Sequence, residues 1–129
     1  FDLVQVHNLL AWKEHLKTLF AMKAAGAVRY VGVTTSEGRR HDLLEQIMRN
    51  EPIDFVQFSY NVVDREAEAR LLPLASERGI AVIVNRPFQE GALIRRIGSR
   101  PLPGWAAEIG CASWASRGTT SGCTGCTAR

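Results

Sequence analysis

The chain has 129 residues, enough for about one domain, and its 46% hydrophobic content is ordinary for a globular protein. Its net charge of +3 includes Arg117 and Arg129, which lie in a final segment without acidic residues, and no stripe of basic residues appears elsewhere. This pattern excludes an electrostatic nucleic-acid surface. No apolar run approaches the roughly 18 residues of a membrane helix and no signal peptide opens the chain, so we expect no membrane partner. The sequence does not specify an oligomeric state.

The three cysteines, Cys111, Cys123 and Cys126, all fall in the last nineteen residues. Their absence from residues 1–110 fits a reducing compartment, so we expect a cytoplasmic protein without a disulfide scaffold. The Cys123-x-x-Cys126 spacing could form half of a zinc site, but such a site usually needs four ligands and no histidine lies nearby. We therefore predict no metal site.

Four apolar runs rich in β-branched residues predict strands. The first residue is Phe1 rather than Met, and it already lies in a strand-like pattern, so we expect that the chain starts inside a longer protein. The run at residues 80–84 is apolar without alternation, which predicts a strand covered on both faces. The four predicted strands are Asp2–His7, Tyr30–Thr34, Asp54–Ser59 and Ile80–Asn85.

Helical patterns separate these strands. The first ends at Gly26, and the second ends before Pro52. The third is expected to begin at Asp64, a good N-cap, and to run to Gly79 with a kink or local loosening at Pro73. His15 and His41 lie on helix faces, where we expect both to be solvated.

The predicted strands begin 24 to 28 residues apart, with a helix between each pair. This alternation predicts an α/β fold made of consecutive βα units around a parallel sheet. Periodicity alone leaves two architectures open, a doubly wound open sheet and part of a (β/α)₈ barrel.

Each predicted strand ends in hydrogen-bonding side chains: His7 and Asn8, then Thr34 and Thr35, then Gln57, then Asn85 and Arg86. In a parallel barrel these ends form the active-site rim. Amides and hydroxyls suit a cofactor that carries an amide, whereas a metal would find few ligands. Each residue also has a structural interpretation: the histidine as a hydrogen-bonding partner, the threonines as helix caps, and residues 85–87 as a turn.

Four segments carry a family resemblance: "VQVHNL", "GAVRYVGVTTS", "IDFVQFSYNVVDREAEARLLPLASERGIAVIVNRPFQEGAL" and "LPGWAAEIGCASWA". Over residues 1–115, their order and spacing resemble the second half of an aldo/keto reductase. The resemblance implies a partial (β/α)₈ TIM barrel, with the four strands as the fourth to seventh of eight. It also implies a nicotinamide cofactor bound without a Rossmann fold, expected to be NADP(H) in preference to NAD(H), and no GxGxxG motif is present.

The resemblance implies reversible hydride transfer between the nicotinamide and a small carbonyl or alcohol substrate. In the family, a tyrosine whose pKa is lowered by a lysine and an aspartate acts as general acid, and a histidine orients the carbonyl. His7 matches that histidine and is the expected catalytic residue. The other three belong to the half of the barrel that precedes Phe1, so we expect this chain alone to be inactive. The alternative is a non-catalytic module that binds a nucleotide or a protein partner, because some family members are regulatory subunits.

The resemblance also identifies residues that contact the cofactor. The two threonines stand where the family usually has a Ser-Asn pair on the nicotinamide carboxamide, and the glutamine matches another carboxamide ligand. An asparagine replaces an aromatic residue that often stacks on the nicotinamide, and an arginine loop approaches the pyrophosphate. The expected cofactor-binding residues are Thr34, Thr35, Gln57, Asn85, Arg86, Pro87 and Phe88.

Residues 1–110 are therefore expected to form the partial barrel, and residues 111–129 an irregular, disordered or frame-shifted tail. The resemblance continues through residues 111–115, where a barrel helix is expected, and then stops. Every aliphatic residue larger than alanine disappears there, and Thr, Gly, Cys, Ser and Arg take over. A natural disordered extension is the alternative.

Resequencing the coding region tests the frame-shift hypothesis. A one-base insertion or deletion near codon 116 is expected to restore helical spacing followed by a Val/Ile-rich strand, because a barrel helix must cover the sheet. The hypothesis fails if the tail is confirmed and no other frame gives such a pattern.

Overall fold

The fold was examined in a computed structural model, which describes residues 1–36, 40–98 and 100–109. The chain divides into two compact units, Phe1–Pro87 and a second that begins at Phe88, and each is described by itself. The expected boundary of the barrel at residue 110 therefore stays a prediction, and the expected irregular tail (residues 111–129) lies outside the described residues.

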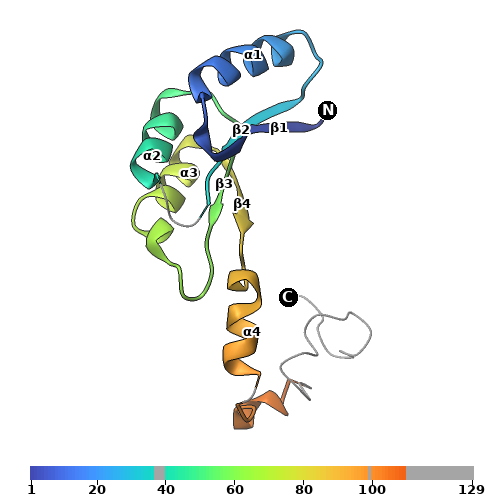
Figure 1. The fold of residues 1–129 in the computed structure, drawn as a ribbon, viewed down its shortest axis with the longest axis vertical. Helices are drawn as coiled ribbons and strands as arrows, with labels where there is room; N and C mark the ends of the chain where they lie inside the picture. The colour runs from blue at the N-terminus through green and yellow to red at the C-terminus, as the bar shows by residue number, and fades with distance from the viewer. Residues whose placement is uncertain (37–39, 99, 110–129) are drawn as a thin grey trace. The chain divides into compact units, whose positions relative to one another are not determined.

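The first unit contains a four-stranded parallel sheet with three α-helices between its strands (Figure 1). Each strand is followed by a helix or a short 3₁₀ turn, as the spacing of the apolar runs predicts. The strands are β1 (Leu3–Val6), β2 (Tyr30–Thr34), β3 (Phe55–Ser59) and β4 (Ala81–Asn85). The helices are α1 (Trp12–Ala24), α2 (His41–Asn50) and α3 (Leu71–Arg78), with 3₁₀ turns at His7–Leu9 and Glu66–Glu68.

The second unit is short and helical. It consists of a 3₁₀ turn at Gln89–Gly91, the helix α4 (Ala92–Ile97) and a further 3₁₀ turn at Gly104–Ala106.

The strand order β1-β2-β3-β4 resolves the choice between the two architectures. All neighbouring strands are parallel, and the order never reverses within the described sheet. Right-handed crossovers then place each connecting helix on the same face, and Figure 1 shows α2 and α3 side by side. A doubly wound sheet would reverse its order at a switch point. The prediction of a partial (β/α)₈ barrel is confirmed.

One face of the sheet is buried against the helices. Val6, Val33, Val56 and Val82 lie in one register row across all four strands, and the middle two are fully buried. Their side chains share an apolar core with residues from the helices. Because side chains alternate along a strand, the residues between these valines point to the opposite face.

The third helical segment differs from its prediction. Asp64 does not begin a helix: a 3₁₀ turn forms at Glu66–Glu68, and α3 begins only at Leu71. Pro73 is consequently the third residue of α3, within the first turn, where a backbone N–H has no intrahelical partner. The predicted kink at Pro73 is wrong because the proline stands where its missing donor costs nothing.

The prediction that residues 80–84 are covered on both faces is also wrong. Ala81 is exposed, and 40% of Val84 is accessible to solvent. Ala81 and Val84 have opposite parity along β4 and so point to opposite faces, which shows that neither face of the strand is fully covered.

An ion pair fastens α1 to the amino-terminal end of the sheet. Lys23 Nζ lies 2.7 and 2.6 Å from the two carboxylate oxygens of Asp54, and one of these oxygens also accepts the N–H of Val31 at 2.8 Å. The backbone N–H of Asp54 in turn donates to the carbonyl of Val31 at 2.8 Å. One carboxylate thus joins a helix to two neighbouring strands where β3 begins.

Gly32 marks a close approach between β2 and β3. It is buried, and its register partner on β3 is Phe55. A Cβ atom at residue 32 would lie 2.6 Å from the carbonyl oxygen of Phe55 and 3.0 Å from its Cβ. The first contact is with backbone, so it cannot be relieved by rotating a side chain.

Gly32→Ala is therefore expected to lower the free energy of unfolding by about 1–3 kcal/mol, the usual effect of overpacking a filled site. Urea denaturation followed by circular dichroism measures this change. Gly104→Ala is the matched control, because a Cβ at Gly104 meets nothing within 4 Å. Equal unfolding midpoints for the two variants would contradict this account of the contact between β2 and β3.

Candidate functional site

The predicted cofactor residues lie at the carboxyl-terminal edge of the sheet. Thr34 and Gln57 are register partners on neighbouring strands, and Asn85 closes β4 as the register partner of Ser59. By the alternation of the strands, Thr34, Gln57 and Asn85 share the face that lies away from the helices. The structure thus brings a hydroxyl and two amides to one rim.

Thr35 differs from Thr34 in its direction. It follows β2 with the same parity as Val33, on the helix side, and is only 2% exposed. Its backbone takes part in the rim instead: its N–H donates to the carbonyl of Gln57 at 2.9 Å. Of the two threonines, Thr34 is the one that presents its side chain with Gln57.

Asn85 has a structural contact at the position where the family often has an aromatic residue. Its Nδ2 donates to the carbonyl of Thr35 at 3.1 Å. Because Thr35 follows β2 and Asn85 ends β4, this bond crosses the end of the intervening strand β3. The Oδ1 atom of Asn85 is buried and has no hydrogen-bond partner among the described residues.

His7 follows β1, the neighbour of β2, one position beyond the register pair of Val6 and Val33. It is exposed, begins the 3₁₀ turn after β1, and precedes Asn8, whose backbone is left-handed with φ of 52°. Asn8 Nδ2 lies 3.0 Å from His7 Nε2. An amide nitrogen only donates, so this contact needs Nε2 as an acceptor and the imidazole proton on Nδ1.

The hollow beside His7 contains no predicted cofactor residue. It has a volume of about 240 Å³ and is lined by residues of β1 and α1 with His15, which is exposed as predicted. The structure therefore brings Thr34, Gln57 and Asn85 to one face of the sheet edge, whereas His7 lines a hollow that none of these three residues lines.

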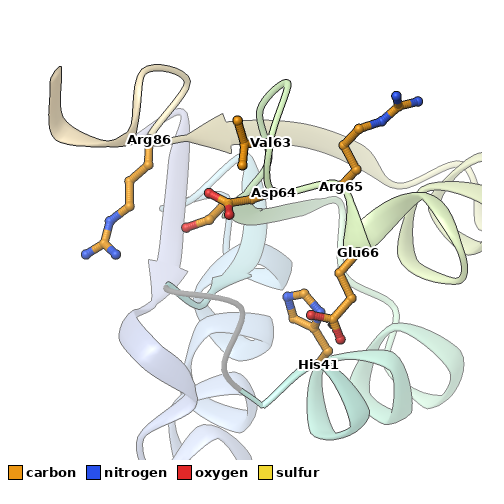
Figure 2. A pocket seen from close by; sticks show the side chains of 7 residues that line it. His41, Val63, Asp64, Arg65, Glu66 and Arg86 are labelled. Carbon is orange, nitrogen blue, oxygen red and sulfur yellow. Dashed lines mark ion pairs between the residues drawn. The ribbon is translucent and has the colours of Figure 1, made fainter. Parts of the chain in front are cut away.

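A second hollow, of about 430 Å³, lies where the loops after β3 and β4 meet the start of α2 (Figure 2). Arg86 is the predicted site residue that lines it. Figure 2 shows Asp64 between Arg86 and the pair formed by His41 and Glu66. The lining residues are His41, Ser59, Val63, Asp64, Arg65, Glu66 and Arg86.

His41 corrects the expectation that it is solvated. It is 7% exposed as the first residue of α2, and its Nδ1 lies 3.5 Å from a carboxylate oxygen of Glu66. The helical pattern places His41 correctly on α2, but its burial comes from the loop after β3, which is distant in sequence. No local pattern identifies such a contact.

The hydroxyl of Tyr60 is engaged in a hydrogen bond within the loop after β3. It donates to Glu68 Oε1 at 2.5 Å, while Arg65 Nε and Nη2 bind the two oxygens of the same carboxylate at 2.8 Å each. The bond to Glu68 raises the pKa of Tyr60, with smaller contributions from burial and from the carboxylate charge. Arg65, followed by Tyr60, lowers the pKa of Glu68.

The bond to Glu68 and the raised pKa both oppose proton donation by Tyr60, because a catalytic tyrosine needs its pKa lowered toward neutrality. Tyr30 lies at the opposite end of the sheet, as the first residue of β2. Its ring packs edge-on against Phe55, with centroids 5.5 Å apart, and under the Arg29 guanidinium. Neither tyrosine of the chain is placed to donate a proton at the rim.

The loop after β4 leaves the sheet through a left-handed residue. Arg86 has φ of 53°, and its carbonyl accepts the Nδ2–H of Asn61 at 3.1 Å. Pro87 is exposed, and Phe88, 58% exposed, begins the second unit. Asn61 was not among the residues predicted for the site.

Metal ligands do not converge in the described part of the chain. Within residues 1–36, 40–98 and 100–109, no three His, Cys, Asp or Glu side chains lie close enough to hold a metal ion. All three cysteines lie outside these ranges. The helices of the described ranges are too short or too polar to cross a membrane.

Comparison with known proteins places this geometry in context. A model of the Aldo/keto reductase family matches residues 1–103. The chain is 30% identical over 93 residues to the NADH-specific methylglyoxal reductase of Escherichia coli, covering 72% of this chain and 28% of that protein. It is 28% identical over 105 residues to the versiconal hemiacetal acetate reductase of Aspergillus parasiticus, covering 77% and 31% respectively.

The structural comparison agrees with the sequence comparison. The fold matches aldo-keto reductase AKR11C1 of Bacillus halodurans, in its holo form, with a TM-score of 0.62 and 26% identity. The match covers 81% of this chain and 33% of that structure. The chain thus spans about a third of the length of its relatives. With the family matched over residues 1–103 and the parallel βα units in sequential order, the chain belongs to the aldo/keto reductase family.

Proposed function

We propose that this chain supplies the carboxamide-binding rim of a reductase that transfers a hydride between a nicotinamide dinucleotide and an aldehyde or ketone. The observation that carries the proposal is the pairing of Thr34 and Gln57 as register neighbours on the face away from the helices. A hydroxyl and a primary amide can together donate to and accept from a carboxamide. The family of the chain supports the reaction class.

The side chains at the rim fit such a cofactor. A nicotinamide ring carries one carboxamide, and Gln57, partly buried on β3, offers both an acceptor and donors to it. Thr34 adds a hydroxyl beside it, and the backbone bond from Thr35 to the Gln57 carbonyl fixes the strand ends. The bound nicotinamide would supply or accept the hydride. Arg86, in the loop after β4, would provide positive charge for the pyrophosphate.

We assign His7 the role of orienting the substrate carbonyl. The role requires an imidazole N–H directed at the carbonyl oxygen, and the contact between Asn8 Nδ2 and His7 Nε2 needs that nitrogen as an acceptor. For Nε2 to donate to a substrate, the bond to Asn8 must therefore be exchanged for one to the carbonyl. The exposed position of His7 at the end of β1 leaves the ring accessible for this exchange.

The dinucleotide is proposed as NAD(P)H without a choice between the two forms. The family resemblance led us to expect NADP(H), but the E. coli relative is by name NADH-specific, and no described residue distinguishes the two. The substrate is proposed as a small carbonyl compound, in line with the name of the E. coli relative, a methylglyoxal reductase. A cytoplasmic location remains our proposal, on the absence of cysteine from residues 1–110.

The roles of His7 and Gln57 can be separated in the reductase purified at its native length. His7→Ala is expected to lower kcat with carbonyl substrates far more than it raises the Kd for the dinucleotide. Gln57→Ala is expected to weaken dinucleotide binding by about 1–3 kcal/mol, the cost of leaving a carboxamide without its partner. Fluorescence titration and steady-state kinetics measure the two quantities.

His15→Ala is the matched control for His7, since His15 is exposed on α1 and lines the same hollow. If both His7→Ala and Gln57→Ala change kcat and Kd equally, the separate roles are wrong. Dinucleotide binding without any turnover in the native-length protein would favour the non-catalytic module.

The 129-residue chain alone is expected to show no carbonyl reductase activity. Its two tyrosines are placed away from the rim or held by Glu68, so no phenol is available to protonate the carbonyl oxygen. Oxidation of NADPH and NADH in the presence of a reactive aldehyde measures this. Turnover above that of a His7→Ala version of the same chain would disprove the expectation.

A further inference from the structure

We propose that Asn61 is a positioning residue for cofactor binding, because it holds the backbone of Arg86 where the chain leaves β4. The inference rests on the proposed function, since it concerns the loop assigned to the dinucleotide. Asn61 is 7% exposed and lies two residues beyond the end of β3. Figure 2 shows Asp64 and Arg86, the two residues whose oxygens its amide reaches, on the hollow between these loops.

The amide of Asn61 is fully used. Its Oδ1 accepts the backbone N–H groups of Val63 and Asp64 at 2.9 Å each. Its Nδ2 donates to Asp64 Oδ2 at 2.7 Å and to the carbonyl of Arg86 at 3.1 Å. A primary amide has two donors and two acceptor positions, so all four are occupied. Three of the four bonds close a turn within residues 61–64, and only the bond to Arg86 leaves it.

The backbone conformation of Arg86 has to be stabilised by neighbouring groups. Its φ of 53° lies in the left-handed region, which non-glycine residues rarely adopt. The following Pro87 further restricts the conformations open to Arg86. A strained residue of this kind persists only where its surroundings fix it. In the described structure, the bond from Asn61 is one that fixes the Arg86 carbonyl directly.

The bond also continues the pairing of β3 with β4 beyond their last residues. Ser59 and Asn85 are the final register pair, and the Tyr60 N–H reaches the Asn85 carbonyl at a stretched 3.4 Å. One residue further along each chain segment, the side chain of Asn61 donates to the Arg86 carbonyl, where a longer strand would use a backbone N–H. Loss of this donor is therefore expected to free the loop that begins at Arg86 without unpairing the strands.

Asn61→Asp isolates the donor function. A carboxylate can still accept the two N–H groups of the turn, but it cannot donate to Arg86 and it repels Asp64. The double variant Asn61→Asp/Asp64→Asn restores an amide–carboxylate pair within the turn but no donor from residue 61 to Arg86. Asn61→Ser, which keeps a short acceptor for the turn, guards against misfolding of the charged variant. Asp64→Asn alone and Asn50→Asp serve as controls, since Asn50 is an exposed asparagine at the end of α2.

The variants are made in the native-length protein, and three quantities are measured: Tm, hydrogen exchange at the Arg86 and Phe88 amides, and the Kd for NADPH and NADH. We expect Asn61→Asp and Asn61→Ser to raise Kd about tenfold and to accelerate exchange, with kcat within about twofold. The double variant is expected to regain Tm but not affinity. The Asn50→Asp control is expected to leave Kd unchanged, and Asp64→Asn measures the effect of the charge change at residue 64 by itself.

The possible failures are distinguishable. If exchange at Arg86 and Phe88 is unchanged in Asn61→Asp and Asn61→Ser while the wild type binds dinucleotide, the positioning role is wrong and the proposed function stands. If the double variant regains full affinity, Asn61 acts only within its own turn. If the wild type binds neither dinucleotide, the proposed function fails, and the role of Asn61 in cofactor binding fails with it.

Discussion

The burial of one sheet face against three helices is the constraint on which the remaining structure depends. Val33 and Val56 are fully buried in a register row that crosses all four strands. Because side chains alternate, burying this row commits Thr34, Gln57 and Asn85 to the opposite face. A slip of one residue would bury their polar groups and expose the valines, so hydrophobic burial itself specifies the polar rim.

The rim is then held by side-chain amides that act where the backbone ladder ends. Asn85 reaches from β4 across β3 to the Thr35 carbonyl, and Asn61 reaches from the loop after β3 to the Arg86 carbonyl. Both are partly or fully buried, where a hydrogen bond is worth more because water competes less well for its partners. Two factors therefore determine the rim. The alternation of side chains along each strand selects which residues face it, and hydrogen bonds from asparagine side chains fix the backbone that carries them.

The sequence was sufficient for the features that local patterns determine. All four strands lie within one residue of their predicted bounds, because each is a dense apolar run between turn residues. The start of α3 was not predictable in the same way. Asp64 has the side chain of an N-cap, but its carboxylate accepts from Asn61 instead, and that contact depends on how the loop folds over β4. Likewise, the polar side chain of His41 predicts exposure to solvent, yet the 61–66 loop covers it.

The candidate site also contains residues that the sequence predicts and a contact that it does not. The rim residues Thr34, Gln57 and Asn85 were predicted from their positions at strand ends and from the family resemblance. The structure places them on one face because side chains alternate along each strand. The positioning contact of Asn61 was not found, since it joins residues 25 positions apart through a side chain that a motif search reads as a turn former. A strand-end asparagine followed by an acidic residue three positions later is common, and it shows nothing of a distant carbonyl.

The electrostatics of the loop after β3 set a limit on what this part of the barrel can contribute chemically. Glu68 holds the proton of Tyr60 in a short hydrogen bond and is itself kept ionised by Arg65. The Tyr60–Glu68 hydrogen bond and the Arg65–Glu68 ion pair therefore stabilise the loop. The raised pKa of the Tyr60 phenol opposes proton donation at neutral pH. In the described structure, Thr34 and Gln57 present a hydroxyl and an amide at the rim, and Arg86 lines the hollow between the loops after β3 and β4. Neither of the two tyrosines is therefore available as a proton donor, so the described residues can orient polar groups but supply no phenol for proton transfer.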